Sequence, residues 1–170
     1  MDESGQDRHV GHDRRFGLDG ARAAADGGDE EVARWVGDFL ASRGSDNPAL
    51  AAALAQDPHW WYGPVPLPLA DLERLAGPEA DAVCTVAPQE WEHDVDGMRE
   101  LLDDGWEPPP LLAEWHDGRL LLHDGNHRYE ALVRAGESHA WTLVYFSRLV
   151  DRDRFAHRHL ELLRHGGRRA

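Results

Sequence analysis

Lysine is absent from this chain, and all 18 basic residues are arginine. The absence excludes mechanisms that depend on a lysine, namely the Walker phosphate loop, the phosphate-binding lysine of protein kinases and Schiff-base chemistry. Cysteine occurs once, at Cys84, which excludes an internal disulfide and is typical of a reducing compartment. A phosphate site in this chain therefore has to use arginine, backbone amides or a metal ion.

Long hydrophobic runs are also missing. No apolar stretch approaches the roughly 20 residues that a membrane-spanning helix needs. The first 28 residues contain no hydrophobic signal core either. These absences predict a cytoplasmic protein with no membrane partner.

Basic residues are far outnumbered by acidic ones, and the net charge is −14. Nucleic-acid binding depends on the neutralisation of phosphates by basic side chains, so a nucleic-acid partner is not expected. The short cluster of Arg164, Arg168 and Arg169 is interpreted as a solvated tail.

At 170 residues the chain suits one domain with extensions, divided by composition into four segments. Residues 1–28 are poor in large apolar side chains, which predicts a disordered leader. Residues 29–58 are predicted to form a helical extension, because apolar residues recur there at helical spacing. Residues 59–150 should form the main domain, followed by a C-terminal helix and basic tail over 151–170.

Within the main domain, the pattern predicts an α+β fold with a small mixed sheet. Three prolines restrict the segment 63–69 to the edge of a sheet. The remaining expected elements are a short helix over 71–75, a helix over 95–104 capped by Asp94, strands over 111–115 and 119–123 joined by a hairpin turn, a helix ending at Gly136 and a strand over 141–146.

The most informative stretch follows the strand over 119–123 and begins Asp124-Gly125-Asn126-His127-Arg128. A strand that leads through a glycine turn into a helix forms a natural anion site, because the amides of the first helical turn have no intrahelical partner. Arg128 would lie in that turn, where its guanidinium could hold a phosphate in two places. The sequence therefore predicts a phosphorylated ligand, and a nucleotide in particular.

The order of elements from Pro64 to Phe146, together with this turn, resembles the ParB/sulfiredoxin superfamily. Its members place a Pro-led strand and a hairpin before a Gly-x-His-Arg or Gly-Glu-Arg-Arg turn and its helix. Here the matching segments are Val65–Leu69, Asp94–Gly105, Pro108–Trp115, Arg119–His123 and Gly125–Gly136. The resemblance implies a ParB/sulfiredoxin-like single domain.

Members of this superfamily use the turn in different ways. Sulfiredoxins carry their catalytic cysteine where this chain has Asn126, so sulfiredoxin chemistry, which needs a thiolate, is not expected. ParB partition proteins bind cytidine triphosphate and attach a basic DNA-binding domain, for which nothing after Phe146 has the length or charge. The free-serine kinases have an Asp-Gly-His-type turn that Asp124-Gly125 resembles most closely.

Each residue of the turn has a functional and a structural interpretation. Asp124 could hold Mg²⁺ or act as a base, or it could cap the following helix. His127 could donate to a phosphate oxygen or protonate a leaving group, or lie on the helix surface. Asn126 could itself be the cap. Glu92 is a candidate general base from outside the turn, although it could equally be solvated.

The functional hypothesis is a protein that binds a nucleotide, with Mg²⁺, through Gly125, Asn126, His127 and Arg128. In its catalytic form, Asp124, His127 and Glu92 would serve the transfer or hydrolysis of the terminal phosphoryl group, with a small molecule as acceptor. The alternative is a non-catalytic nucleotide-sensing or protein-interaction module whose flanking helices dock a protein partner. A DNA-associated partition regulator is a third option, which the acidic charge disfavours.

Overall fold

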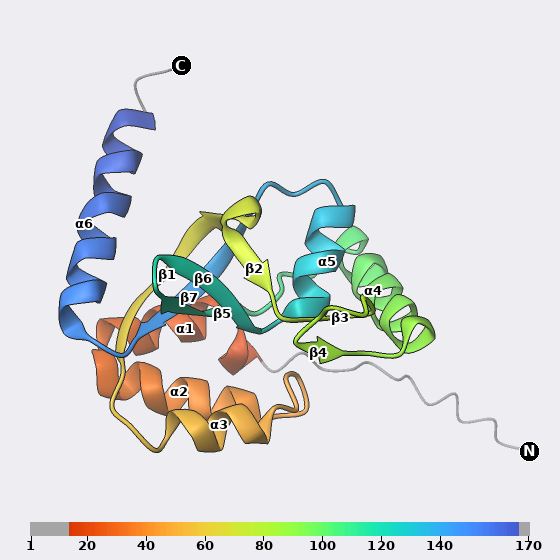
Figure 1. The fold of residues 1–170 in the computed structure, drawn as a ribbon, viewed down its shortest axis with the longest axis horizontal. Helices are drawn as coiled ribbons and strands as arrows, with labels where there is room; N and C mark the ends of the chain where they lie inside the picture. Colours follow the sequence, from red (N-terminus) through yellow and green to blue (C-terminus); the bar gives the residue numbers. More distant parts are fainter. Residues whose placement is uncertain (1–13, 167–170) are drawn as a thin grey trace, which may run out of the picture.

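The computed structural model describes residues 14–166. The chain forms a mixed sheet enclosed by helices (Figure 1), and its elements in chain order are η1 (Arg14–Phe16), α1 (Leu18–Asp26), α2 (Asp29–Ala41), α3 (Pro48–Leu54), β1 (Trp60–Pro68), η2 (Leu69–Asp71), β2 (Leu72–Arg74), β3 (Ala76–Gly77), β4 (Cys84–Thr85), α4 (Pro88–Asp103), β5 (Leu111–His116), β6 (Arg119–Asp124), α5 (Asn126–Arg134), β7 (His139–Phe146) and α6 (Leu149–Gly166).

The main sheet has the strand order β1-β7-β5-β6-β2, and a two-stranded sheet pairs β3 with β4. β1 lies at an edge, as the prolines of the segment 63–69 predicted. β5 and β6 form the expected antiparallel hairpin, whose turn places Asp117 and Gly118 at positive φ. β7 joins β5 in parallel and β1 in antiparallel, so the α+β class with a mixed sheet is confirmed.

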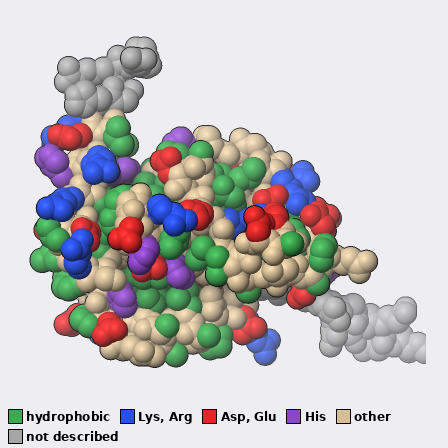
Figure 2. Space-filling model, in the orientation of Figure 1, with side chains coloured by type: hydrophobic (Ala, Val, Ile, Leu, Met, Phe, Trp, Pro, Cys, Tyr) green, Lys and Arg blue, Asp and Glu red, His purple; other side chains and the backbone are tan. Residues whose placement is uncertain are grey.

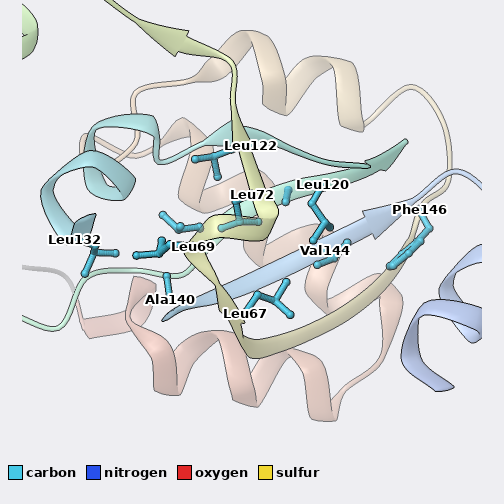
Figure 3. Packing of buried hydrophobic residues seen from close by; sticks show 11 residues of the cluster. Leu67, Leu69, Leu72, Leu120, Leu122, Leu132, Ala140, Val144 and Phe146 are labelled. Atoms are coloured by element: carbon cyan, nitrogen blue, oxygen red, sulfur yellow. The ribbon is translucent and has the colours of Figure 1, made fainter. Parts of the chain in front are cut away.

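Both faces of the sheet are covered. One face presents Leu67, Leu122, Val144 and Phe146, and these pack with the helix residue Leu132 (Figure 3). The opposite face packs against α1 and α2, and its cluster contains Phe16, Val36, Phe39, Trp61, Leu112, Leu143 and Tyr145. Neighbouring residues of β5 and β7 thus alternate between two separate clusters, as side chains of a strand with two covered faces must.

The predicted disordered leader is ordered in part. Residues 14–26 form η1 and α1, and Phe16, Leu18 and Ala21 are buried against the α2 layer. Because large apolar residues are few here, composition indicated too little burial, yet Phe16 and Ala21 join the cluster formed with α2, and Leu18 is buried as well. Residues 1–13 lie outside the described part of the chain, so the prediction made for them is not tested.

Two further predictions of local structure are wrong. The segment 71–75 is not a helix, because Leu72–Arg74 pairs as a parallel strand with Leu120–Leu122. The next helix begins at Pro88 and contains Asp94, which is not its cap. Trp91 and Val95 are fully buried one turn apart, so packing extends the helix upstream of the expected start.

None of the helices within residues 14–166 combines the length and the apolar character required to cross a membrane.

Phe16→Ala should lower the free energy of unfolding by about 3–5 kcal/mol, the range for a buried phenylalanine that leaves a cavity. Phe16 is 6% exposed and packs edge-on against Trp35, with ring centroids 6.0 Å apart. Val83→Ala, at an exposed position, is the control and should change little. Urea denaturation measures both, and an unchanged midpoint for Phe16→Ala would show that η1 adds nothing to the core.

Candidate functional site

The candidate site is the turn between β6 and α5. Gly125 has φ 94° and ψ 24°, a left-handed conformation that favours glycine. A Cβ at this position would come within 2.6 Å of Leu111 Cδ2 and 3.0 Å of Arg128 Nη2, so a larger residue would have to displace these side chains. The glycine turn is therefore present as predicted, but the predicted caps are wrong: Gly125 itself is the N-cap, and no side chain in the described part of the chain caps α5.

Arg128 does not extend toward an open phosphate position. It is 5% exposed, and its Nη2 donates to Asp124 Oδ2 at 2.6 Å. Its Nη1 donates to the carbonyl oxygens of Pro109 at 2.7 Å and Pro110 at 3.0 Å. Burial lowers the pKa of the Arg128 guanidinium, while the Asp124 carboxylate raises it. The guanidinium that was expected to hold a ligand instead stabilises the segment that leads into β5.

The carboxylate of Asp124 also has its hydrogen-bond partners within the protein. Besides the bond from Arg128, its Oδ1 accepts a hydrogen bond from Ser45 Oγ at 2.8 Å and one from Asn47 Nδ2 at 3.3 Å. A carboxylate that is 6% exposed and accepts three side-chain donors has little capacity left for a base or a metal ligand. Within residues 14–166, no group of three or more His, Cys, Asp and Glu residues is arranged to hold a metal ion. The residues of the turn do not fit the expected Mg²⁺.

Asn126 connects three segments of the backbone. Its Oδ1 accepts from the amides of Leu75 at 3.0 Å and Ala76 at 3.1 Å, and its Nδ2 donates to the carbonyl of Leu122 at 3.2 Å. These bonds join the small sheet to the end of β6. The Asn126 side chain is therefore occupied in holding the turn together.

His127 lies on the first turn of α5 against Trp91 of α4, with ring centroids 4.3 Å apart. Its Nε2 is buried and has no hydrogen-bond partner within the described residues, and Asp94 Oδ2 is 3.9 Å away. Burial lowers the pKa of His127 more than the nearby Asp94 raises it. The imidazole is therefore neutral at pH 7 and packs as an aromatic surface.

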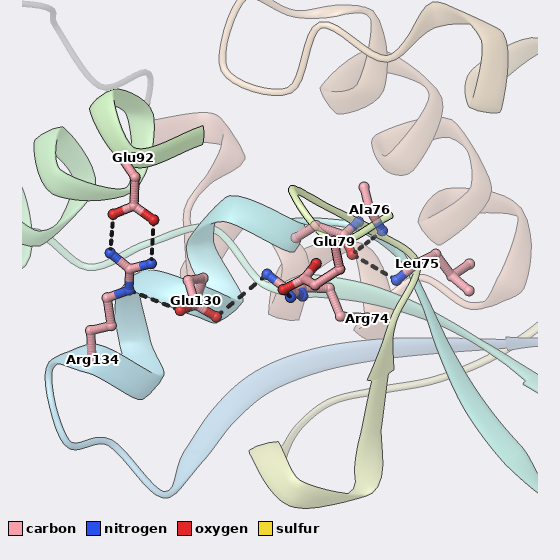
Figure 4. A network of polar contacts seen from close by, with 8 residues as sticks. Arg74, Leu75, Ala76, Glu79, Glu92, Glu130 and Arg134 are labelled. Carbon is pink, nitrogen blue, oxygen red and sulfur yellow. Dashed lines mark hydrogen bonds and ion pairs between the residues drawn. The ribbon is translucent and has the colours of Figure 1, made fainter. Parts of the chain in front are cut away.

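Glu92 does not join the turn. Its carboxylate forms two hydrogen bonds, of 2.6 and 2.9 Å, with Arg134 at the C-terminal end of α5. Figure 4 shows this pair continuing through Glu130 to Arg74 and Glu79, in a chain of ion pairs along α5. Arg134 lies eight positions after Asn126 in α5, or about 12 Å along the helix axis. The structure therefore does not bring Glu92 together with Asp124 and His127.

A cavity of about 1140 Å³ lies between the N-terminal helices and the C-terminal end of α4. Of the residues 124–128, only Arg128 lines it. Its wall is mainly apolar, with Asp19 and Glu107 as acidic members and Arg15, Arg43 and Arg128 as basic ones. No sequence motif predicts this cavity, because its lining residues come from five separate segments of the chain. The one local signal is Arg43-Gly44, where the glycine indicates a loop.

Asp124→Asn should lower the free energy of unfolding by about 3–5 kcal/mol, because it leaves a buried guanidinium without its counter-charge. Asp117→Asn, in the exposed hairpin turn, is the control. Thermal unfolding distinguishes the two variants, and equal stability would show that the pair is not structural.

Protonation of His127 should destabilise the fold. Its pKa in the folded chain lies below the ordinary value of 6.5, so the unfolded chain binds more protons at slightly acidic pH. The contribution of His127 is then fully present above pH 6.5 and is lost as the pH falls toward the folded-state pKa. His127→Gln should show a smaller loss of stability between pH 7 and pH 5 than the unmodified chain, and identical pH profiles would contradict this account.

No protein-family model matches the chain, and no curated protein matches it. Three solved structures are similar to part of it. A conserved hypothetical protein from Pyrococcus furiosus is 20% identical, with 48% of this chain and 31% of that one covered and a TM-score of 0.35. A variant free serine kinase in complex with AMP is 19% identical, with 48% and 30% covered and a TM-score of 0.34.

A Pnob8-like ParB-N domain is 18% identical, with 66% of this chain and 39% of that one covered and a TM-score of 0.31. This chain spans 30–39% of the length of these structures. Because each TM-score is below 0.5, the likenesses carry no argument about the activity of this chain.

Proposed function

We propose that this protein is a non-catalytic module that binds a phosphorylated small molecule of the nucleotide class. The observation that carries the proposal is the cavity of about 1140 Å³ with Arg43 at its edge and Arg128 in its wall. Arg43 is exposed, and no hydrogen bond or ion pair holds its side chain within the described part of the chain. An arginine in that state is available to a phosphate in two places.

The rest of the cavity suits the heterocyclic base of a nucleotide. Apolar and aromatic side chains line it from four elements and the loop after α4, among them Phe16, Phe39, Met98, Leu101 and Trp106. Ligand sites are typically apolar concave surfaces with a few polar groups that orient the ligand. A heterocyclic base would pack on the apolar wall while the phosphates reach Arg43, so this combination favours a nucleotide over a free phosphate.

Binding without turnover is favoured over phosphoryl transfer. Phosphoryl transfer requires charged groups positioned around the reacting phosphate. Asp124 is already engaged by Arg128, Ser45 and Asn47, and Glu92 lies at the far end of α5. The non-catalytic alternative needs none of these groups, and it also needs no resident metal ion.

Arg43→Ala should weaken nucleotide binding about 10- to 100-fold, the equivalent of a charge-assisted hydrogen bond of roughly 1.5–3 kcal/mol. The measurement is calorimetric titration with ATP, GTP, CTP, AMP and inorganic phosphate in turn. Arg34→Ala is the matched control, because Arg34 lies on α2, pairs with Glu31 and does not line the cavity.

Two outcomes would contradict the proposal. If none of the five ligands binds, or if Arg43→Ala binds them as the unmodified chain does, the cavity is not the site. If a nucleotide binds and its terminal phosphate is released on incubation, the module is catalytic, and the enzymatic alternative is correct.

A further inference from the structure

The C-terminal half of α6 extends beyond the rest of the described molecule (Figure 1). Up to His159 the helix is anchored, because Phe155 packs against Phe146 and His159 Nδ1 lies 3.0 Å from the hydroxyl of Tyr62. Beyond that point three leucines are solvent-exposed, namely Leu160 at 47%, Leu162 at 65% and Leu163 at 55%. Figure 1 shows the helix continuing past the sheet with no neighbouring element. Three exposed leucines within one turn indicate an interaction surface.

The charge of α6 is opposite to that of the whole chain. The helix carries four arginines and three carboxylates, whereas the chain has a net charge of −14. Figure 2 shows basic side chains gathered along this projecting helix. Arg158 and Arg164 flank the exposed leucines in sequence. The projecting half of α6 therefore presents leucines flanked by two arginines, with Glu161, which pairs with His157, among the leucines.

A second cavity has the complementary character. It measures about 420 Å³ and lies where α4 ends, α5 ends and β7 begins. Leucine, proline and tryptophan side chains form much of its lining, including Leu102, Pro108, Leu111, Leu132 and Trp141. Asp103, Glu107 and Glu137 add three exposed carboxylates. An apolar floor with an acidic border matches a helix that bears leucines and arginines.

The α6 helix of the same chain cannot fill this cavity. The cavity lies beside His139, Ala140 and Trp141 at the start of β7, whereas α6 follows the end of that strand. An eight-residue strand spans about 26 Å. α6 is also held against β1 and β7 by Phe155 and His159, and it lies on the other side of the molecule from α4 and α5 (Figure 1).

We propose that the projecting half of α6 docks in the second cavity of another copy of this chain. Leu160 and Leu163, one turn apart, enter the apolar floor, and Arg158 and Arg164 face the carboxylates of Asp103 and Glu137. Each copy has one such helix and one such cavity, and the two lie on opposite sides of the molecule, so successive copies associate head to tail.

The first test is the mass in solution, by size-exclusion chromatography with light scattering over a concentration series. The unmodified chain should show species of two or more times the monomer mass of 19.1 kDa, and their mass should rise with concentration. Leu160→Asp combined with Leu163→Asp should yield a monomer. Val83→Asp is the matched control, because Val83 is an apolar residue that is 82% exposed on the β3–β4 connection and should leave the assembly intact. A monomer at every concentration of the unmodified chain would overturn the proposal.

The second test identifies the acceptor. Asp103→Arg combined with Glu137→Arg reverses the charge of two residues at the border of the cavity and should also yield a monomer. A 1:1 mixture of the helix variant and the cavity variant retains one intact helix and one intact cavity, so the two-chain species should return. If the cavity variant still associates, or if the mixture remains monomeric, α6 does not dock there. Circular dichroism confirms that both variants, altered only at exposed positions, keep the fold.

Discussion

The buried ion pair between Asp124 and Arg128 connects more of this structure than any other polar contact of the candidate site. Asp124 receives hydrogen bonds from the loop between α2 and α3, and Arg128 donates to the carbonyls that lead into β5. One pair of side chains thus joins the N-terminal helical layer, the end of β6, the start of α5 and the entrance to β5. Taking two charges out of water costs several kcal/mol for each ion, and only this full set of partners offsets that cost.

The same constraint decides where a ligand can bind. The charged side chains of the Asp124–Arg128 turn are hydrogen-bonded to one another and to neighbouring segments, so the turn has a structural role. The space for the proposed ligand lies beside the turn. The cavity between the N-terminal helices and α4 has Arg128 in its wall, with Arg43 at the edge as a cation that makes no bond to the described residues. The N-terminal helices are thereby part of the proposed binding site and not an accessory to the domain.

The elements that the sequence predicted correctly are those whose signals are local. The prolines of the segment 63–69 required an edge strand, Asp117-Gly118 required a tight hairpin, and Gly125 required a left-handed turn before a helix. The elements that it predicted incorrectly depend on distant partners. Leu72–Arg74 is a strand only because β6 lies beside it, and α4 starts early only because Trp91 packs against α5.

The same distinction between local signals and distant partners applies to the candidate site. By itself, the sequence determined that a glycine turn joins a strand to a helix, that no lysine can take part in binding, and that the residues Asp124 to Arg128 share one turn. Only the tertiary structure decided what those residues do, because a carboxylate and a guanidinium with the same local spacing can face a ligand or each other. Here they face each other, since the loop carrying Ser45 and Asn47 and the carbonyls of Pro109 and Pro110 close around them. Such closure depends on segments up to 79 residues apart, a separation that no local pattern encodes.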